Sequence, residues 1–362
     1  MTRVRIGVIG CGAIAQIQHL PFLTELAEEF EVVMVCDISP SAAKYVAELF
    51  HVPKYTTDYR EVLESDVDAV LLCQTDPKTA VAVASFEAGK HVFIEKPMCA
   101  SLQEADAIIA AAEASGKVGQ VGYVKLYEPA FETARREVAT IDDVRFVQVN
   151  HLHPDNALHM QQFRTRRFDD LPDGVIEETA AARRIAMADA IGEASPEAER
   201  AFGMLSGSLI HDLYGLRTLF GMPSRIASAE VWADGRALST VLEYPEGHRA
   251  VISWVDLPEL WDFHETLEVY GGGKRVLVSY ESGFSRGQST VTVQEIEADG
   301  TSVRKSPELD WESPFRRELR HFHECIVDGV ESRSPVASAR DDIALIIDIA
   351  KAYMTGGAVI RG

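Results

Sequence analysis

Short runs of apolar residues alternate with helical patterns through the first 125 residues. Five of these runs are rich in β-branched residues and are too short for helices, namely residues 4–9, 32–36, 69–73, 92–94 and 118–121. Continuous apolar runs of this length are typical of strands that are buried on both faces of a parallel sheet. We therefore predict a doubly wound, parallel α/β domain over residues 1–124.

Capping residues mark the ends of the helices that lie between these runs. Ser39-Pro40 predicts a helix start with proline in the first turn. Ser101 and Glu104 have the spacing of a capping box, and Gly116 is placed to end the helix that they begin. The helices between the strands therefore have defined boundaries in the sequence.

The second half of the chain has a different pattern. Its β-forming runs are residues 144–149, 226–232, 237–244, 250–255, 266–270, 276–280 and 290–296. Turn residues fill several of the short gaps, which favours hairpins and an antiparallel or mixed sheet. Helical patterns follow over 315–327 and 341–353, and the polar stretch 155–202 is interpreted as a helical insertion. We therefore predict a second domain over residues 125–362.

Composition narrows the range of partners. The formal net charge of −21 would repel nucleic acid and anionic lipid, so neither is expected as a partner. The five cysteines have no C-x-x-C spacing and are expected to act as small apolar residues in a reducing compartment. No apolar stretch has the length of a membrane span, and no secretory segment precedes the first strand, so a cytoplasmic location is expected.

A glycine-rich turn follows the first predicted strand and opens a helix. Gly10, Gly12 and Ala15 match the G-x-G-x-x-A form of the dinucleotide fingerprint. Gly10 would permit the tight turn, Gly12 the close approach of a diphosphate, and Ala15 the packing of helix against strand. The helix N-terminus would present N–H groups to the phosphates. A plain glycine turn is the alternative, but the strand before it and the helix after it favour dinucleotide binding.

Asp37 ends the second predicted strand, at the position where a carboxylate can accept hydrogen bonds from the adenosine ribose. Its charge would repel the 2′-phosphate of NADP, and no arginine or lysine follows closely, so NAD is the expected cofactor. Ser39 leaves NADP open, and a helix-capping role for Asp37 is the alternative.

Lys96 lies in the tripeptide Glu95-Lys96-Pro97, directly after the strand-like run 92–94. Ligands of open α/β sheets bind at the carboxyl ends of the strands. A partly desolvated lysine beside a cationic nicotinamide ring would have a lowered pKa and could exchange a proton with a substrate hydroxyl.

The chain resembles the glucose–fructose oxidoreductase/inositol dehydrogenase/rhizopine-catabolism (Gfo/Idh/MocA) family. The resemblance is carried by the glycine fingerprint, by Asp37, and by the segments 87–98, 122–129 and 317–322. It extends over nearly the whole chain except the insertion, and the run that ends at Lys96-Pro97 is its most specific part. It implies a Rossmann domain followed by an α+β domain with a large, open, mostly antiparallel sheet that commonly forms subunit interfaces.

This resemblance also implies NAD(P)-dependent oxidation or reduction of sugars, cyclitols and related polyols, with Lys96 acting on the substrate hydroxyl. A homo-oligomer, dimer or tetramer, is expected. The predicted cofactor site consists of Gly10, Gly12, Ala13, Ile14, Asp37, Thr75, Glu95, Lys96 and Pro97.

The family's second catalytic element is a helix with the pattern Asp-x-x-x-His. In the matching segment of this chain His211 fills the histidine position, but Gly207 stands at the aspartate position. Lys96 and His211 therefore remain as the predicted catalytic pair, with a packing histidine as the alternative for His211. Asp212 points about 100° away from His211 around a helix, so it does not automatically replace the aspartate.

Further substrate-binding residues are predicted in the second domain. His151 and His153 share one face of a strand and could contact substrate; a metal site and a structural role are the alternatives. No metal is expected, because hydride transfer to nicotinamide needs none. Lys125 and Tyr127 match a family stretch near cofactor and substrate, and a solvated loop is the alternative. Aromatic residues near a strand turn could stack on a sugar or pack in a core: Trp254, Trp261 and His264.

The leading hypothesis is an NAD-dependent dehydrogenase that acts on a secondary alcohol of a sugar, glycoside or cyclitol. One alternative is an enzyme that retains NAD and cleaves glycosidic bonds by transient oxidation and elimination. A non-catalytic sensor that binds dinucleotide is the other, and the intact Lys96 argues against it.

Overall fold

The computed structural model describes residues 2–260 and 262–361, so Trp261 lies outside the described residues. The chain divides into two compact units. Unit one contains residues 1–124, 163–192 and 313–343, and unit two contains 125–162, 193–312 and 344–362. The domain boundary predicted after residue 124 coincides with the end of the first segment of unit one. Two later segments, 163–192 and 313–343, also belong to unit one, so the domains are not continuous in sequence.

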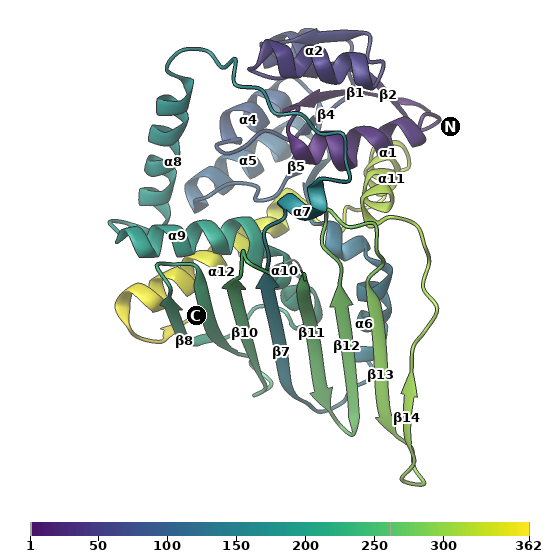
Figure 1. The fold of residues 1–362 in the computed structure, drawn as a ribbon, viewed down its shortest axis with the longest axis vertical. Coiled ribbons are helices and arrows are strands. Elements are labelled where there is room, and N and C mark those ends of the chain that lie inside the picture. The colour runs from purple at the N-terminus through teal and green to yellow at the C-terminus, as the bar shows by residue number, and fades with distance from the viewer. Residues whose placement is uncertain (1, 261, 362) are drawn as a thin grey trace. The chain divides into compact units, whose positions relative to one another are not determined.

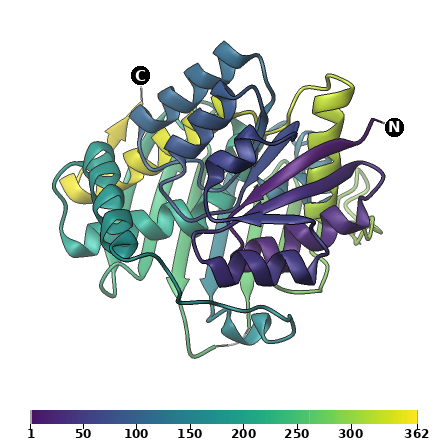
Figure 2. The same cartoon turned by 90° about the horizontal axis from the view of Figure 1, so that it is seen from above.

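Unit one is built on a six-stranded parallel sheet with helices on both faces (Figure 2). In sheet order the strands are β3 (Lys54–Thr56), β2 (Phe30–Cys36), β1 (Val4–Ile9), β4 (Ala69–Leu72), β5 (His91–Glu95) and β6 (Gly119–Gly122). The helices are η1 (Ala15–His19), α1 (Leu20–Glu25), α2 (Pro40–Leu49), α3 (Tyr59–Glu64), α4 (Thr79–Glu87), α5 (Leu102–Ser115), α8 (Val175–Ile191) and α11 (Pro314–Val327). The order 3-2-1-4-5-6 is that of a dinucleotide-binding Rossmann sheet.

The central strands of this sheet are apolar because helices cover both of their faces. Ile6, Val8 and Leu71 are completely buried in the core of unit one. Leu319 and Phe322 from α11 belong to the same core, which explains why this late segment returns to unit one. Burial of one such side chain contributes about 1.5–3 kcal/mol, so the sheet faces and α11 stabilise one another.

The caps predicted from the sequence are present. The Ser39 hydroxyl accepts the Ala42 N–H at the start of α2. At α5 the Ser101 hydroxyl accepts the Glu104 N–H, and the Glu104 carboxylate accepts the Ser101 N–H in return. Each cap satisfies backbone groups that the first helical turn leaves without partners.

Unit two is built on a nine-stranded sheet (Figure 1). In sheet order the strands are β14 (Ser302–Lys305), β13 (Thr290–Ile296), β12 (Lys274–Tyr280), β11 (His264–Gly271), β7 (Val144–His153), β10 (Arg249–Asp256), β9 (Ala237–Glu243), β8 (Arg225–Trp232) and β15 (Val359–Ile360). All neighbouring pairs are antiparallel except β7 and β10, which are parallel. The predicted fold class, a Rossmann domain followed by a large, mostly antiparallel sheet, is confirmed.

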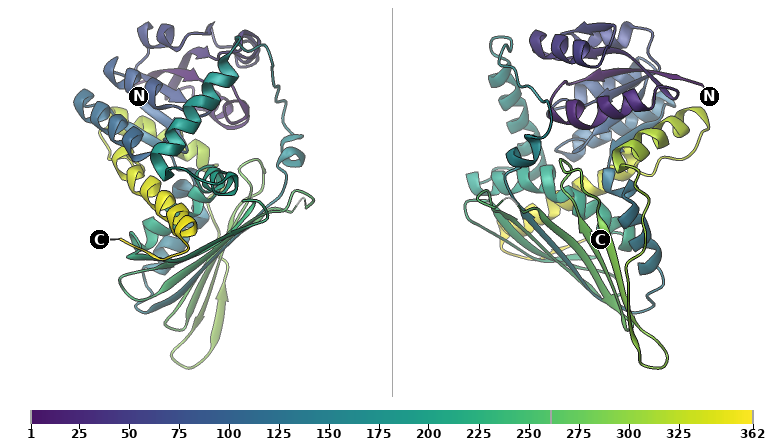
Figure 3. Two further views of the ribbon diagram at one scale, coloured as in Figure 1. Left: turned by 90° about the vertical axis from the view of Figure 1, so that its left-hand side faces the viewer. Right: turned by 45° about the vertical axis from the view of Figure 1, so that its right-hand side comes forward.

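Helices of unit two lie against one face of its twisted sheet. The helices with residues in this unit are η2 (Val124–Tyr127), α6 (Pro129–Val138), α7 (Ala157–Met160), α9 (Pro196–Met204), η3 (Leu205–Leu209), α10 (Ile210–Phe220) and α12 (Val336–Thr355), and α12 begins in unit one. The helix α6 contacts β12 and β13, and α9 contacts β8 (Figure 3, left). Among the described residues, no helix combines the length and apolar character needed to span a bilayer.

All five cysteines are buried and carry free thiols, in agreement with their expected role as small apolar residues. Burial raises the pKa of the Cys36 thiol to about 12 and that of the Cys325 thiol to about 11. Burial also raises the thiol pKa values of Cys11, Cys73 and Cys99. The thiols therefore stay protonated at neutral pH.

Candidate active site

The glycine turn of unit one joins β1 to the helix that follows it. Gly10 has a φ of +97°, and a Cβ built there would lie 2.3 Å from the Gln74 backbone nitrogen. A side chain at Gly10 would therefore strain the turn and collide with the backbone after β4. A Cβ at Gly12 would meet no atom within 4 Å, so this glycine faces open space. That open space at the start of a helix fits a diphosphate.

The Asp37 carboxylate is fixed beside this turn, where β2 ends. Its Oδ2 accepts the Cys11 N–H at 2.8 Å, and its Oδ1 accepts the Ser39 N–H at 2.9 Å. A carboxylate oxygen has capacity for more than one hydrogen bond, so Asp37 can still accept from ribose hydroxyls. The structure thus places the carboxylate where the sequence predicted it.

The other predicted cofactor residues follow neighbouring strands at the same edge of the sheet. Ala13 and Ile14 are half-buried after β1, and Thr75 is exposed after β4. Glu95 ends β5, and Pro97 follows it half-buried. Because β2, β1, β4 and β5 are adjacent and parallel, their carboxyl ends bring all these residues to one edge of unit one.

Lys96 begins the loop after β5. Its backbone N–H donates to Glu95 Oε2 at 3.0 Å, and the residue is half-buried. Burial lowers the pKa of the Lys96 ammonium; Lys78 lowers it further, while Glu95 and Asp76 oppose the shift. The net direction is downward. Lys96 therefore has the location and the electrostatic setting expected of a proton-transfer lysine.

Glu95 is part of a buried pair that sequence reasoning missed. His19 Nε2 lies 2.5 Å from Glu95 Oε1, and both side chains are almost completely buried. Burial alone would raise the pKa of the Glu95 carboxyl, but His19, Lys96 and Lys78 outweigh it, so this pKa is lowered. Glu95 therefore stays ionised next to Lys96.

Lys78 is a second lysine at this edge that the sequence patterns did not single out. Its ammonium donates to Asp76 Oδ1 at 2.6 Å and to the Pro97 carbonyl at 2.9 Å, and the residue is 2% exposed. It thereby braces the loop that carries Lys96. The signal was available, because Lys78 follows the carboxyl end of β4 as Lys96 follows that of β5.

His211 lies in unit two, at the start of α10 and just after the π-helical segment η3. Its Nδ1 is 2.9 Å from the Tyr214 hydroxyl, which itself accepts the Lys125 backbone N–H at 3.1 Å. Because that hydroxyl accepts from Lys125, it is able to donate its own proton to His211 Nδ1. In that arrangement Nδ1 accepts a hydrogen bond, and the proton of a neutral imidazole would lie on Nε2.

The Lys125 side chain neutralises two buried carboxylates in unit two. Its ammonium contacts Glu265 and lies 3.6 Å from Asp212 Oδ1, and it is 4.3 Å from the centre of the Tyr280 ring. The side chains of Asp212 and Glu265 are 1% and 3% exposed. Burial raises the pKa of the Asp212 carboxyl, but Lys125 and His151 outweigh it, so the net shift is downward.

Two histidines on β7 extend this cluster as a chain of hydrogen bonds. His151 Nδ1 lies 2.9 Å from Asp212 Oδ2, and His151 Nε2 lies 3.2 Å from His153 Nδ1. His153 Nε2 in turn lies 3.0 Å from the side-chain nitrogen of Asn156. If His151 Nδ1–H donates to Asp212, then His151 Nε2 accepts from His153 Nδ1–H, and His153 Nε2 accepts from the Asn156 amide. The predicted common face of His151 and His153 is thus observed.

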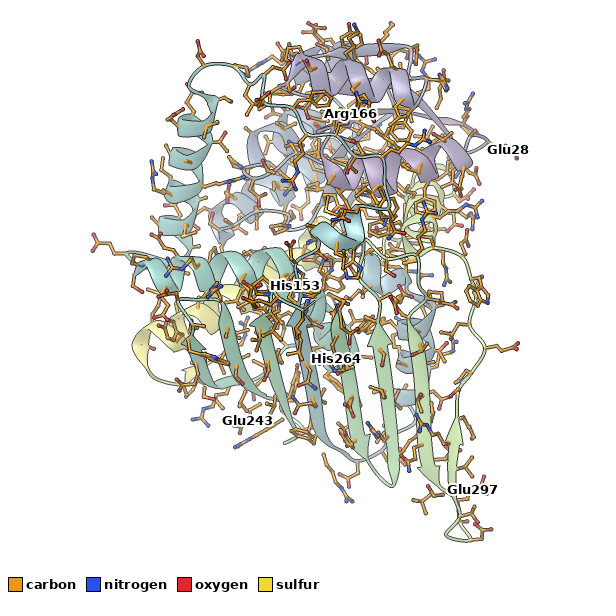
Figure 4. All side chains as sticks on the ribbon, in the orientation of Figure 1. Glu28, His153, Arg166, Glu243, His264 and Glu297 are labelled. Atoms are coloured by element: carbon orange, nitrogen blue, oxygen red, sulfur yellow. The ribbon has the colours of Figure 1, made fainter. Side chains whose placement is uncertain are left out.

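Aromatic and hydroxyl groups line the same part of unit two. The His153 ring stacks on Trp254 with centroids 5.7 Å apart, and Trp254 Nε1 donates to the Ser208 hydroxyl at 2.9 Å. Figure 4 labels His153 on β7 and His264 on the adjacent strand β11. Tyr127, the remaining predicted substrate residue, is 1% exposed.

The set His151, Asp212 and Glu265 has the spacing of a metal site, since one ligand atom of each lies within 4.8 Å of the others. The Lys125 ammonium contacts Glu265 and approaches Asp212, so an internal cation already provides the positive charge. The expectation that no metal is needed stays a prediction.

The predicted residues thus form two groups. Unit one brings together the glycine turn, Asp37, Thr75 and the segment 95–97. Unit two brings together Lys125, His151, His153 and His211, which the sequence could list but not connect. Gly207, at the family's aspartate position, lies on η3 with open space where a side chain would be.

Comparisons with known proteins agree with these features. Residues 4–123 match the family model described as "Oxidoreductase family, NAD-binding Rossmann fold". Inositol 2-dehydrogenase 3 of Saccharopolyspora erythraea is 36% identical over 137 residues, which are 37% of this chain and 40% of that protein. Inositol 2-dehydrogenase of Acidothermus cellulolyticus is 31% identical over 178 residues, 48% of this chain and 51% of that protein. The matches therefore span about half or less of these relatives.

The likeness in fold extends further than the likeness in sequence. The crystal structure of a putative NADPH-dependent oxidoreductase from Desulfitobacterium hafniense superposes with a TM-score of 0.79 at 16% identity, covering 99% of this chain and 98% of that one. At this identity the likeness shows the fold alone. In sequence, residues 4–123 resemble the Gfo/Idh/MocA oxidoreductases with their NAD-binding Rossmann fold.

Proposed function

We propose that this protein is a nicotinamide-dependent dehydrogenase that moves a hydride between NAD and a secondary alcohol of a sugar, glycoside or cyclitol. Lys96 is the proton-transfer residue in this proposal. The observation that carries it is the position of Lys96, at the carboxyl end of β5 in an NAD-binding fold, with a lowered pKa. The inositol dehydrogenases among the relatives support the substrate class.

The chain's own residues would hold the cofactor at the edge of the unit-one sheet. The backbone at Gly12 and the following helix N-terminus would receive the diphosphate, and Asp37 would accept hydrogen bonds from the adenosine ribose. When bound, the nicotinamide ring supplies the hydride acceptor or donor. Glu95, which accepts the Lys96 N–H, and Lys78, which donates to the Pro97 carbonyl, would hold the loop that carries Lys96.

The proton moves through Lys96 Nζ. A lowered pKa increases the neutral fraction of this amine, which would take the proton of the substrate hydroxyl as the alcohol is oxidised. In the reverse direction the ammonium returns that proton. His211 Nε2–H, whose tautomer Tyr214 supports, would donate a hydrogen bond to the substrate oxygen. Lys125, Tyr127, His151 and His153 are proposed to contact substrate.

The glycine at position 207 favours one further candidate. The chain lacks the aspartate of the family's Asp-x-x-x-His pattern, and altered proton handling of this kind would suit an enzyme that retains NAD and cleaves glycosides by transient oxidation and elimination. The two functions differ in one observable, because only a dehydrogenase accumulates free NADH.

The test is the ultraviolet absorbance of NADH while the purified protein and NAD meet a panel of sugars, inositols and glycosides. A rising signal with one substrate class is expected, and Lys96→Ala should lower kcat by about 10²–10⁴-fold, the usual contribution of a general acid–base residue. Lys54→Ala, at an exposed lysine on β3, is the matched control and should retain activity.

NAD affinity, measured by isothermal calorimetry, separates chemistry from binding. We expect Lys96→Ala to bind NAD within a few-fold of wild type. Binding of NAD without NADH formation, combined with release of a glycoside's aglycone, would favour the retained-cofactor enzyme. Binding of NAD with no reaction on any member of the panel would support a dinucleotide sensor and overturn the proposal. Full NADH formation by Lys96→Ala would overturn the role of Lys96 in proton transfer.

A further inference from the structure

A segment of unit one, residues 163–170, crosses the amino end of α2 (Figure 1, teal). It has no regular secondary structure, yet two side chains of unit one bind its backbone. Gln16 donates to the Arg166 carbonyl at 3.0 Å and accepts the Arg166 N–H at 3.0 Å. Tyr45 donates its hydroxyl proton to the Arg164 carbonyl at 3.1 Å.

The segment is thereby tied to the glycine turn. Gln16 also donates to the Cys11 carbonyl at 2.7 Å, so one buried amide joins the turn to Arg166 (labelled in Figure 4). The Tyr45 ring contacts Phe168 at a centroid distance of 5.5 Å, and Phe168 packs against the core of unit one. These contacts give the segment a defined path past the ribose end of the predicted cofactor site.

Asp170 ends this path at the first turn of α2. One of its carboxylate oxygens accepts the Ser39 hydroxyl proton, and the other accepts the Ser41 backbone N–H at 2.9 Å. The Ser39 N–H is already held by Asp37. Two carboxylates, Asp37 and Asp170, therefore engage the backbone and side-chain donors that follow β2.

These donors are the ones that a 2′-phosphate would need. In Rossmann domains the residue that ends β2 binds the adenosine ribose 2′-hydroxyl, so a phosphate on that oxygen would extend toward the first turn of α2. A phosphate there requires N–H and O–H donors or an arginine. Here Asp170 already accepts hydrogen bonds from the Ser39 hydroxyl and the Ser41 N–H, so these donors are not available to a phosphate. Its negative charge would also repel the phosphate.

We infer that Asp170 is a specificity-determining residue that makes this protein select NAD over NADP. The inference rests on the proposed function, since it requires that the chain binds a nicotinamide dinucleotide. Asp170, from the segment 163–170, would act against NADP together with the negative charge of Asp37 at the end of β2. The hydrogen bonds from Ser39 and Ser41 lower the pKa of the Asp170 carboxyl, so the charge persists at neutral pH.

The test compares the affinities of the full chain for NAD and for NADP by isothermal calorimetry. We expect Asp170→Ala to bind NADP on the order of tenfold more tightly than wild type does, because one exposed charge is partly screened by water and salt. NAD affinity should change by no more than a few-fold, and the gain for NADP should shrink as salt is raised. Asp169→Ala, a charge deletion at the adjacent exposed residue, is the matched control and should leave the NADP affinity unchanged.

The remaining outcomes separate the inference from the function on which it rests. Normal NAD binding with an unchanged NADP affinity in Asp170→Ala would overturn the inference and leave the proposed function standing. An equal gain in Asp169→Ala would also overturn it, since surface charge in general would then be the cause. Failure of every variant, and of wild type, to bind either dinucleotide would overturn the proposed function and the inference together. Asp170→Asn, which removes the charge but keeps an acceptor for Ser39, should give part of the gain and guards against a variant that folds poorly.

Discussion

The buried cluster around Lys125 allows a quantitative prediction about stability in unit two. In the wild type, the Lys125 ammonium faces the Glu265 and Asp212 carboxylates, both nearly inaccessible to water. Lys125→Met removes the positive charge and keeps a side chain of similar length. Two buried negative charges then remain together, with His151 as the adjacent titratable side chain.

The expected cost follows from this charge count. Breaking a buried ion pair by removing one partner costs about 3–5 kcal/mol, because the other charge is left uncompensated. Lys125→Met leaves two such charges, so we expect a loss at the upper end of that range. Glu265→Gln instead leaves one ammonium facing one carboxylate, and it should cost less. The double variant should be more stable than the sum of the single changes implies.

Urea unfolding at neutral and at mildly acidic pH measures these differences. In wild type the Asp212 pKa is lowered, so Asp212 contributes stability above its unfolded-state pKa and loses it as the pH falls through the folded value. In Lys125→Met the principal cause of that lowering is absent, so Asp212 takes up a proton more readily. The deficit relative to wild type should therefore shrink in mild acid. A deficit that does not change with pH, or a Lys125→Met variant no less stable than Glu265→Gln, would refute this reasoning.

Two further outcomes are expected in unit one. Gly10→Ala should destabilise the fold by about 2 kcal/mol or more, because the position has a positive φ and a Cβ there would collide with the Gln74 backbone. Gly12→Ala should leave thermal stability nearly unchanged, because its Cβ meets open space, but it should weaken NAD binding in calorimetry. Glu318, whose carboxyl oxygens find no hydrogen-bond partner among the described residues, has a pKa raised well above its usual value by burial and by Glu95. Between the unfolded-state pKa and the higher folded-state pKa of this carboxyl, only the folded protein holds the proton. The free energy of unfolding should therefore fall by about 1.4 kcal/mol per pH unit across that range. Glu318→Gln should remove this slope in urea unfolding measured across pH, and an unchanged slope would exclude Glu318 as its source.

Local signals in the sequence predicted much of the fold. Buried strands such as β1 and β4 are continuous apolar runs, and the Ser101–Glu104 cap depends on residues three apart. The parallel pairing of β7 with β10 could not be predicted, since it joins strands separated by two other strands and several helices. Short edge strands such as β15, with two residues, also carry too little pattern to detect.

The same distinction applies to the candidate site. Gly10, Asp37 and Lys96 follow strands directly, so strand patterns alone place them at one edge of a parallel sheet. Partners that are distant along the chain were missed. His19 reaches Glu95 across 76 positions, and Ser39 reaches Asp170 across 131. Such pairs depend on how distant segments of the chain meet in the fold, which no periodicity of the sequence records.

The buried cysteines have a practical consequence for chemical labelling. Thiol reagents attack the thiolate, and here all five thiols are shielded from solvent and held protonated by their raised pKa values. A cysteine introduced at the exposed position Arg167 would therefore be the one readily alkylated thiol of the folded protein. A fluorophore attached there would report on the segment that carries Asp170, in a protein whose own cysteines need not be replaced first.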